Sequence, residues 1–230
     1  MDADRLCNLA VKIRQEEVPV DEDAHFLGMK LLGSVLCKGR LHQPAEVTKA
    51  RARRLREGFY DKYVDITRPG IDIGCQHDPL TETFRRYDVI FGDGDATYME
   101  GVPSEAFHTV YAGHILEHVD DPILALKHWW CITAPGGHLI VCVPHRDLYE
   151  KKKFLPSNWN FEHKTYFLPE NHEAPCTRSF RHTLMEAIPD GEIVHFKVCD
   201  EGWKDVGPLV HSCGEYQIEA VLRKPEPRRL

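Results

Sequence analysis

The sequence lacks the features that mark several common classes of protein. No apolar run approaches the roughly 18 residues of a membrane span, and no secretory signal opens the chain. The 8 cysteines form no C-x-x-C pair, and neither they nor the 14 scattered histidines have the spacing of a zinc site. We therefore expect a cytoplasmic protein with free thiols, no membrane span and no metal centre.

An excess of basic charge is also missing. The formal net charge is -7, so we expect no nucleic-acid partner, because a phosphate backbone calls for a basic surface. One basic run, Lys49 to Arg56, is expected to be the solvated face of a helix. The 42% hydrophobic content of the 230 residues is enough for a real core.

Two regions differ in their pattern. Residues 1–60 are polar with helical periodicity, which predicts a helical N-terminal extension with helices over 23–36 and 44–64. Gly58 should interrupt the second helix. Residues 61–230 are then expected to form one domain, and residues 1–45 to cover its ligand or pack against a partner subunit in a homodimer.

Strands and helices alternate through the first half of this domain. Apolar segments predict strands at 70–74, 87–92, 107–113 and 138–144, and a helix capped by Asp121 should begin at Pro122. A helix over 179–188 and two closing strands, 192–201 and 215–224, complete the pattern. The alternation predicts an α/β fold whose parallel strands present ligands at their carboxyl ends.

The first strand leads into an unusual turn. The dinucleotide signature G-x-G-x-x-G is absent, because Gly74 is followed by Cys75, Gln76, His77 and Asp78. Gly74 lets a backbone approach a ligand closely. Asp72 lies inside an apolar run, where a carboxylate needs a partner. That partner is either a cationic ligand group, such as an amino group, or nearby backbone amides.

The segment FGDGDA, residues 91–96, follows the second strand. Acids at this place in a nucleotide-binding sheet commonly accept hydrogen bonds from ribose hydroxyls, and a further acid can accept one from an adenine amino group. Asp93 and Asp95 are the candidates. The alternative is an ordinary Asx turn, for which this sequence is also well suited.

The segment YAGHILEHVDDPILALKHWWCITAPGGHLIVCVP, residues 111–144, resembles the core of class I S-adenosylmethionine-dependent methyltransferases. The matching residues are His114, Leu116, Glu117, His118, Val119, Asp121, Pro122, Pro135, Gly136, Gly137 and Pro144. The resemblance covers about residues 60–145. It implies S-adenosylmethionine as cofactor and a Rossmann-like sheet, mostly parallel with an antiparallel C-terminal strand and helices on both faces.

The same resemblance implies a set of cofactor-binding residues: Asp72, Gly74, Cys75, Asp93, Asp95, Ala96, Gly113 and His114. The chain departs from the family pattern in two ways. The later glycines of the first loop are missing, and the stretch from Gly74 to Asp95 has no room for the usual helix. The acid that holds the ribose is therefore either Asp88 or Asp93, and we favour Asp93.

A narrower resemblance covers DLYEKKKFLPSNWNFEHKTYF, residues 147–167. It looks like a short-core subgroup that accompanies polysaccharide or lipopolysaccharide modification. We expect residues 146–175 to form an acceptor lid in which Tyr149, Trp159, Asn160 and Lys164 bind the substrate. His163 and His145 are the candidate bases for deprotonating a hydroxyl. The alternative is that these rings only pack or cap.

These features together predict a methyltransferase that acts on an oxygen or nitrogen atom of a small-molecule or saccharide acceptor. Two alternatives remain. The altered turn after Gly74 also suits a non-catalytic relative that binds a ligand or a partner. An NAD-dependent oxidoreductase is disfavoured, because the dinucleotide signature is missing.

Overall fold

The computed structural model describes residues 46–207 and 212–226. Its centre is a six-stranded sheet in the order β2-β1-β3-β4-β8-β7. The strands are β1 (Gly70–Ile73), β2 (Arg85–Tyr87), β3 (Phe107–Gly113), β4 (Thr133–Pro144), β7 (Glu192–Cys199) and β8 (Gln217–Arg223). The first four are parallel, and β8 runs antiparallel to both β4 and β7. The predicted fold class is thus confirmed.

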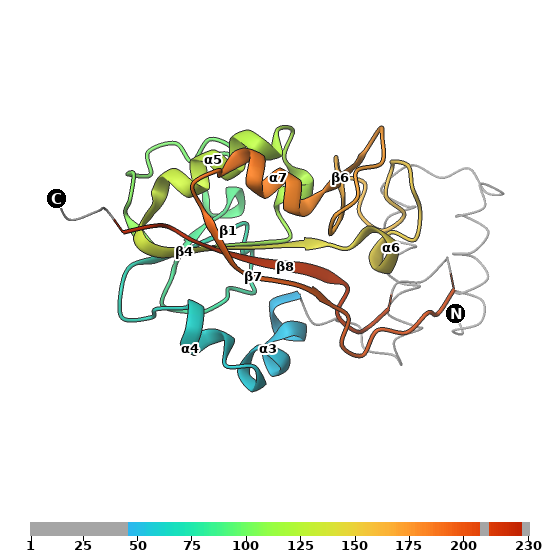
Figure 1. Cartoon of the computed structure of the whole chain (residues 1–230), viewed down its shortest axis with the longest axis horizontal. Helices are drawn as coiled ribbons and strands as arrows, with labels where there is room; N and C mark the ends of the chain where they lie inside the picture. Colours follow the sequence, from blue (N-terminus) through green and yellow to red (C-terminus); the bar gives the residue numbers. More distant parts are fainter. Residues whose placement is uncertain (1–45, 208–211, 227–230) are drawn as a thin grey trace.

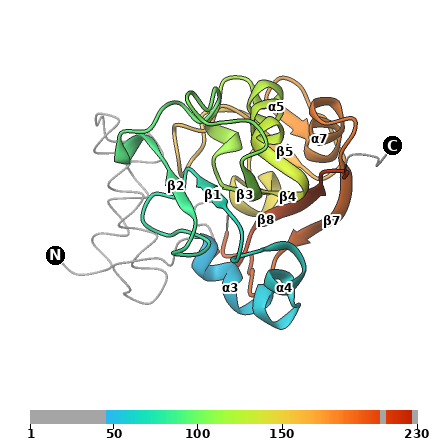
Figure 2. The ribbon, with the colours of Figure 1, turned by 90° about the vertical axis from the view of Figure 1, so that its left-hand side faces the viewer.

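Helices cover both faces of this sheet (Figure 1, Figure 2). One face carries α5 (Pro122–Ile132) and α7 (Phe180–Ala187), and the other carries α3 (Glu46–Arg56) and α4 (Phe59–Tyr63). The start of α5 is as predicted, because the Asp121 carboxylate accepts hydrogen bonds from two backbone N–H groups of its first turn. Gly58, with φ of 66°, separates α3 from α4, as its position in the sequence predicted.

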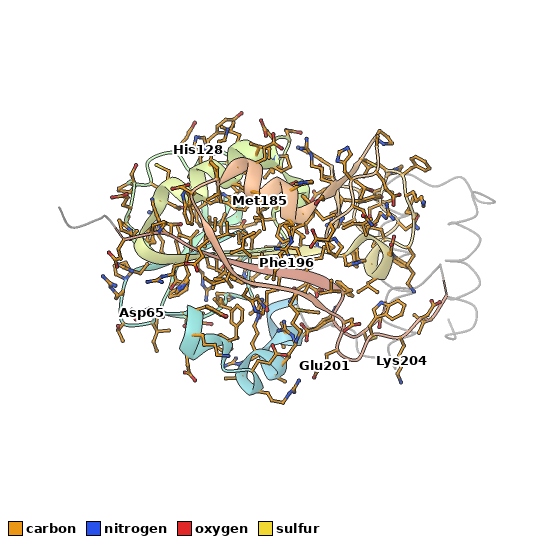
Figure 3. All side chains as sticks on the ribbon, viewed as in Figure 1. Asp65, His128, Met185, Phe196, Glu201 and Lys204 are labelled. Carbon is orange, nitrogen blue, oxygen red and sulfur yellow. The ribbon has the colours of Figure 1, made fainter. Side chains whose placement is uncertain are left out.

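The main core lies between the sheet and the pair α5 and α7. Trp129 of α5 is fully buried there, together with Phe180 of α7 and Val141 of β4. The Phe196 ring of β7, labelled in Figure 3, lies 5.9 Å from the Phe180 ring and extends this contact to the sheet edge. Burial of such side chains stabilises the fold by roughly 1.5–3 kcal/mol each.

The prediction for the second strand was partly wrong. It placed the strand at 87–92, whereas β2 ends at Tyr87 and a 3-10 turn, η1 (Val89–Phe91), follows. The Asp88 carboxylate causes the change, because it accepts a hydrogen bond from the Ile90 N–H and caps that turn. No helix lies between β1 and β2, as the short spacing predicted.

The prediction that the basic run in α3 forms a solvated helix face was wrong in part. Arg51 and Arg56 are exposed, but Arg53 and Arg54 are buried, so the run is not simply a solvated face. The helix lies against β8, where Glu219 is fully buried and requires cationic partners. Arg54 Nε donates to Glu219 Oε2 at 2.7 Å, and Arg53 Nη1 donates to Glu219 Oε1 at 3.1 Å.

This ion cluster ties the helix before the first strand to the last strand. Glu215, next to β8, joins it by accepting from Arg53 Nη2 at 3.0 Å. Burial alone would raise the pKa of Glu219, but the charges of Arg54 and Arg53 outweigh burial and hold it well below its usual range. The described part of the predicted N-terminal extension therefore packs on the domain itself. Residues 1–45, with the helix expected at 23–36, lie outside the described residues.

The lid segment has little regular structure. It contains α6 (Arg146–Tyr149) and β5 (Tyr166–Leu168), which pairs with β6 (Thr177–Ser179). The cysteines 75, 131, 142, 176 and 199 are free thiols, but Cys213 is disulfide-bonded, so the prediction of free thiols fails at that position. Among the described helices, none is long and apolar enough to cross a membrane.

Candidate functional site

A cavity of about 640 Å³ lies beside the carboxyl ends of β1 and β3. Its size falls within the range of about 300–1,000 Å³ that small-molecule sites occupy. Residues of α3, of the turn after β1, of the turn after β3 and of the lid all reach it. Its lining comprises Glu46, Val47, Thr48, Asp72, Gly74, Cys75, Gln76, His77, Asp78, Tyr111, Gly113, His114, Glu117, His118, Tyr149, Asn160, His163 and Tyr216.

Asp72 supplies the cavity with a buried carboxylate. Its Oδ2 accepts a hydrogen bond from the Leu80 N–H at 2.6 Å, which folds the loop back onto β1. Its Oδ1 has no hydrogen-bond partner among the described residues, although the side chain is buried. This burial raises the pKa of Asp72 to about 7. An orphaned oxygen in a cavity wall is suited to a cationic group on a ligand.

The turn after β1 is held close to its neighbours. Gly74 has φ of 72°, and a Cβ there would lie 2.9 Å from the Ile115 side chain, so both conformation and space require glycine. Its N–H donates to the Tyr87 carbonyl at 2.8 Å. The Gln76 N–H, two residues further on, donates to Asp88 Oδ2 at 3.0 Å. The turn therefore keeps a defined path without the later glycines.

The two candidates for the ribose acid have other partners. Asp88 uses one carboxylate oxygen on Gln76 and the other on Ile90, both through backbone N–H groups. Asp93 Oδ2 accepts from the Asp88 N–H at 3.1 Å, and its Oδ1 lies 3.5 Å from Arg85 Nη2. Neither side chain is part of the cavity lining. Both stabilise the turns after β1 and β2.

Asp95 and Ala96 also lie away from the cavity lining. Asp95 is exposed, and its Oδ1 accepts a hydrogen bond from the Thr97 N–H at 2.6 Å, which is the Asx turn weighed as the alternative. The Ala96 carbonyl accepts from Trp129 Nε1 at 2.8 Å and fixes this turn to α5. Of the eight predicted cofactor residues, the structure brings five to the cavity: Asp72, Gly74, Cys75, Gly113 and His114.

The predicted acceptor residues divide in the same way. Tyr149, Asn160 and His163 line the cavity. Trp159 is buried outside the lining, with 7% of its surface exposed. Lys164 points to the surface, where its Nζ lies 2.7 Å from Asp120 Oδ1.

His145, the other candidate base, has a structural role at the start of α6. Its Nδ1 accepts a hydrogen bond from the Asp147 N–H at 3.2 Å and so caps the helix. The backbone N–H of His145 donates to the Tyr216 carbonyl at 2.7 Å. The imidazole is not part of the cavity lining. Of the two histidines, only His163 therefore faces the cavity.

A buried carboxylate of the lid positions His163, a pairing that the sequence did not predict. Glu150 is buried, and its Oε1 lies 2.5 Å from His163 Nδ1, while its Oε2 accepts from Ser157 Oγ at 2.5 Å. Burial alone would lower the pKa of His163, but the hydrogen bond to Glu150 and the charge of Glu117 outweigh burial and raise it. The Glu150–His163 pair places Nε2 of the imidazole at the cavity.

The side of the cavity nearest α3 was also missed. Glu46, the first residue of α3, accepts hydrogen bonds from Tyr216 Oη and from Lys49 Nζ, the latter at 3.0 Å. Lys49 Nζ also donates to Tyr216 Oη at 2.8 Å. Because Tyr216 is 170 positions from Glu46, no local pattern could predict this contact.

Comparison with known proteins identifies a family for this chain. A family model described as a methyltransferase domain matches residues 42–183. No curated protein matches the chain significantly. The chain is similar to an S-adenosylmethionine-dependent methyltransferase structure from Mesorhizobium loti, with 12% identity, 68% of this chain and 90% of that chain covered, and a TM-score of 0.42.

Two further structures of S-adenosylmethionine-dependent methyltransferases are similar to this chain. One is from Archaeoglobus fulgidus, with 17% identity, 78% and 94% of the two chains covered, and a TM-score of 0.45. The other is from Aquifex aeolicus, with 10% identity, 78% and 99% covered, and a TM-score of 0.42.

Proposed function

Since the chain belongs to the methyltransferase domain family, with S-adenosylmethionine as its cofactor, we propose that it methylates an oxygen or nitrogen atom of a small-molecule or saccharide acceptor. The cavity beside β1 and β3 would hold donor and acceptor together. The observation that carries the proposal is the pairing, within this one cavity, of an orphaned acidic oxygen on Asp72 with the Glu150-bound imidazole of His163.

The residues that line this cavity fit the methyl donor, S-adenosylmethionine. The amino group of S-adenosylmethionine is cationic and can donate a hydrogen bond to Asp72 Oδ1. Gly113 also lines the cavity, and its lack of a side chain leaves room for Tyr111, because a Cβ there would lie 2.6 Å from Tyr111 Oη. When bound, the donor supplies an electrophilic methyl group on a sulfonium. The cofactor residues that we propose are Asp72, Gly74, Cys75, Gly113 and His114.

The acceptor side of the same cavity is polar and well positioned. Asn160 offers amide groups, and Tyr149 offers a ring face with a hydroxyl, which is a common combination for holding a sugar or another polyol. His163 is the residue that we place at the reacting atom, with Glu150 fixing its ring. Holding that atom in line with the methyl group can alone supply roughly 7–11 kcal/mol of the acceleration.

The proposal includes an acceptor from polysaccharide or lipopolysaccharide modification. It is supported by the segment from Tyr149 to His163, because the residues that resemble the polysaccharide-modifying subgroup include three that line the cavity. A homodimer and a cytoplasmic location stay predictions. The oxidoreductase alternative has no support, since the turn after Gly74 lacks the dinucleotide signature.

A screen with methyl-labelled S-adenosylmethionine tests the function. Nucleotide sugars, glycan precursors and small polyols would be incubated with the purified chain, and transfer of the label would be measured. We expect transfer to at least one hydroxyl- or amine-bearing acceptor. His163→Gln should lower turnover about 10²–10⁴-fold without changing donor affinity, whereas His182→Gln, an exposed control on α7, should behave as the wild type.

Two results would contradict this account. Full turnover by His163→Gln would remove that residue from the reaction. Loss of donor binding in the same variant would mean that His163 serves the donor side rather than the acceptor side. Calorimetric titration of both variants with the donor separates these cases.

A further inference from the structure

Three potential metal ligands meet at the cavity wall. Glu117 and His118 belong to the 3-10 turn η2 (Leu116–His118) after β3, and His163 comes from the lid. One ligand atom from each lies within 4.8 Å of the others. Glu117 Oε1 is 3.9 Å from His118 Nε2 and 3.9 Å from His163 Nε2.

The backbone explains why distant segments converge here. The Glu117 carbonyl accepts hydrogen bonds from the N–H groups of Lys164 at 2.8 Å and Thr165 at 3.2 Å. These bonds hold the lid against η2 and place His163 opposite Glu117. The arrangement is therefore built into the chain path and does not depend on flexible surface side chains.

The Glu117 carboxylate is buried without a hydrogen-bond partner among the described residues. It is 1% exposed, and neither of its oxygens has a hydrogen-bond partner among the described residues. An isolated buried carboxylate costs several kcal/mol, so such groups are normally paired or coordinate a cation. The Nε2 atoms of His118 and His163 each lie 3.9 Å from Glu117 Oε1, which is too long for a hydrogen bond and leaves a gap between the three side chains.

The other ring nitrogen of His163, Nδ1, is already hydrogen-bonded to Glu150. Its Nδ1 lies 2.5 Å from Glu150 Oε1, so an Nδ1–H donates there and the Nε2 lone pair points toward Glu117. Ser157 Oγ in turn donates to Glu150 and accepts from the N–H groups of Trp159 and Asn160. A carboxylate that orients an imidazole in this way is the usual outer support of a metal-binding histidine.

We propose that Glu117, His118 and His163 bind one divalent first-row transition-metal ion, with Glu150 as the positioning residue for His163. Two imidazoles and one carboxylate suit Zn²⁺, Mn²⁺ or Fe²⁺, with open positions for a substrate or water. Ligand atoms about 2.1 Å from an ion are about 3.4 Å apart at tetrahedral angles, so small side-chain rotations close the present separations.

His114 can extend this site. Its Nδ1 lies 3.7 Å from Glu117 Oε1, and its Nε2 lies 3.0 Å from the Gln217 side-chain oxygen. If the Nε2–H donates to Gln217, the Nδ1 lone pair faces the same gap as the other ligands. The pattern H-x-x-E-H over residues 114–118 is visible in the sequence, but the third histidine is not.

The role of the ion, unlike its binding, rests on the proposed function. Because the site shares its cavity with Asp72 and Asn160, a bound ion would face the acceptor and lower the pKa of a coordinated hydroxyl. The hydroxyl proton would leave to solvent, the new C–O bond would form, and the C–S bond of the donor would break. His163 would then act as a ligand rather than as the proton acceptor, and oxygen would be favoured over nitrogen as the methylated atom.

Metal titration of the full chain tests the site directly. Chelator-treated protein would be titrated with Zn²⁺ by calorimetry and with Co²⁺ by visible spectroscopy. We expect one ion per chain, with a Co²⁺ spectrum typical of nitrogen and oxygen ligands. Glu117→Gln should weaken binding at least about 100-fold, and Glu150→Gln about 10–100-fold. His182→Gln, exposed on α7, is the matched control and should bind as the wild type.

Several outcomes would overturn the proposal. The wild type could fail to bind either ion, or Glu117→Gln could bind as tightly as the wild type. Thermal unfolding guards against misfolded variants, since Glu117→Gln removes an unsatisfied charge and should leave the metal-free protein at least as stable. Binding of S-adenosylmethionine by metal-free protein is measured separately. If the protein binds S-adenosylmethionine but not Zn²⁺, the metal site is refuted and the proposed function is not. If it binds Zn²⁺ but not S-adenosylmethionine, only the proposed function is refuted.

Discussion

The substitution Asp72→Asn should change stability and cofactor affinity in opposite directions. Asparagine keeps the oxygen that accepts from the Leu80 N–H, but it removes the buried charge. Burial raises the pKa of Asp72 from 3.8 to about 7 in the folded chain. That difference of about three pH units corresponds to about 4 kcal/mol of destabilisation when the group is ionised.

The sign of the pH dependence follows from this difference. The folded state holds the Asp72 proton more tightly than the unfolded state does. The contribution of Asp72 protonation to folding stability is therefore fully present below about pH 4 and is lost as the pH rises to about 7. Above about pH 7 this group causes no further change in stability. Without ligand at pH 8, the Asn variant should be more stable than the wild type by up to about 4 kcal/mol.

Cofactor affinity should respond in the other direction. A hydrogen bond to a charged group contributes about 1.5–3 kcal/mol, so the loss of the Asp72 charge should weaken S-adenosylmethionine binding about 10–100-fold. Urea unfolding between pH 4 and 9 and calorimetric titration at pH 8 measure the two effects. Glu82→Gln, at an exposed carboxylate, is the control. A less stable Asn variant with unchanged affinity would refute the reasoning.

Three further substitutions test other parts of the structure. Arg54→Met should lower the free energy of unfolding by about 3–5 kcal/mol in urea, because Glu219 then loses one of its two buried arginine partners; a loss below 1 kcal/mol would contradict the ion cluster. Asp95→Ala should leave donor affinity unchanged in calorimetry, because its carboxylate only caps a turn, and a tenfold loss would return Asp95 to the site. Asn160→Ala should raise the KM for the acceptor about tenfold with no effect on donor affinity, and the opposite pattern would place Asn160 at the donor.

Local signals predicted much of the fold. The bounds of β3 agree with the predicted strand over 107–113, and α5 begins at Pro122 because Asp121 and that proline fix the first turn. The second strand could not be predicted in the same way. Its end depends on the Asp88 side chain, which caps a 3-10 turn and holds the Gln76 backbone, and both are tertiary choices.

The candidate site was predictable only where it lies at strand tips. Asp72 and Gly113 follow from the position of ligands in parallel sheets. The pairing of Glu150 with His163 could not be predicted, because it joins side chains thirteen positions apart in an irregular segment. The basic run was misjudged for a similar reason, since the burial of Arg54 depends on Glu219, 165 positions later.

The placement of the donor is the central claim, and a crystal structure with S-adenosylhomocysteine tests it most directly. We predict that the product's amino group lies about 3 Å from Asp72 Oδ1, with its sulfur toward the side that His163 and Asn160 line. A structure in which that oxygen is satisfied by the chain's own groups, with the product bound elsewhere or absent, would contradict the account.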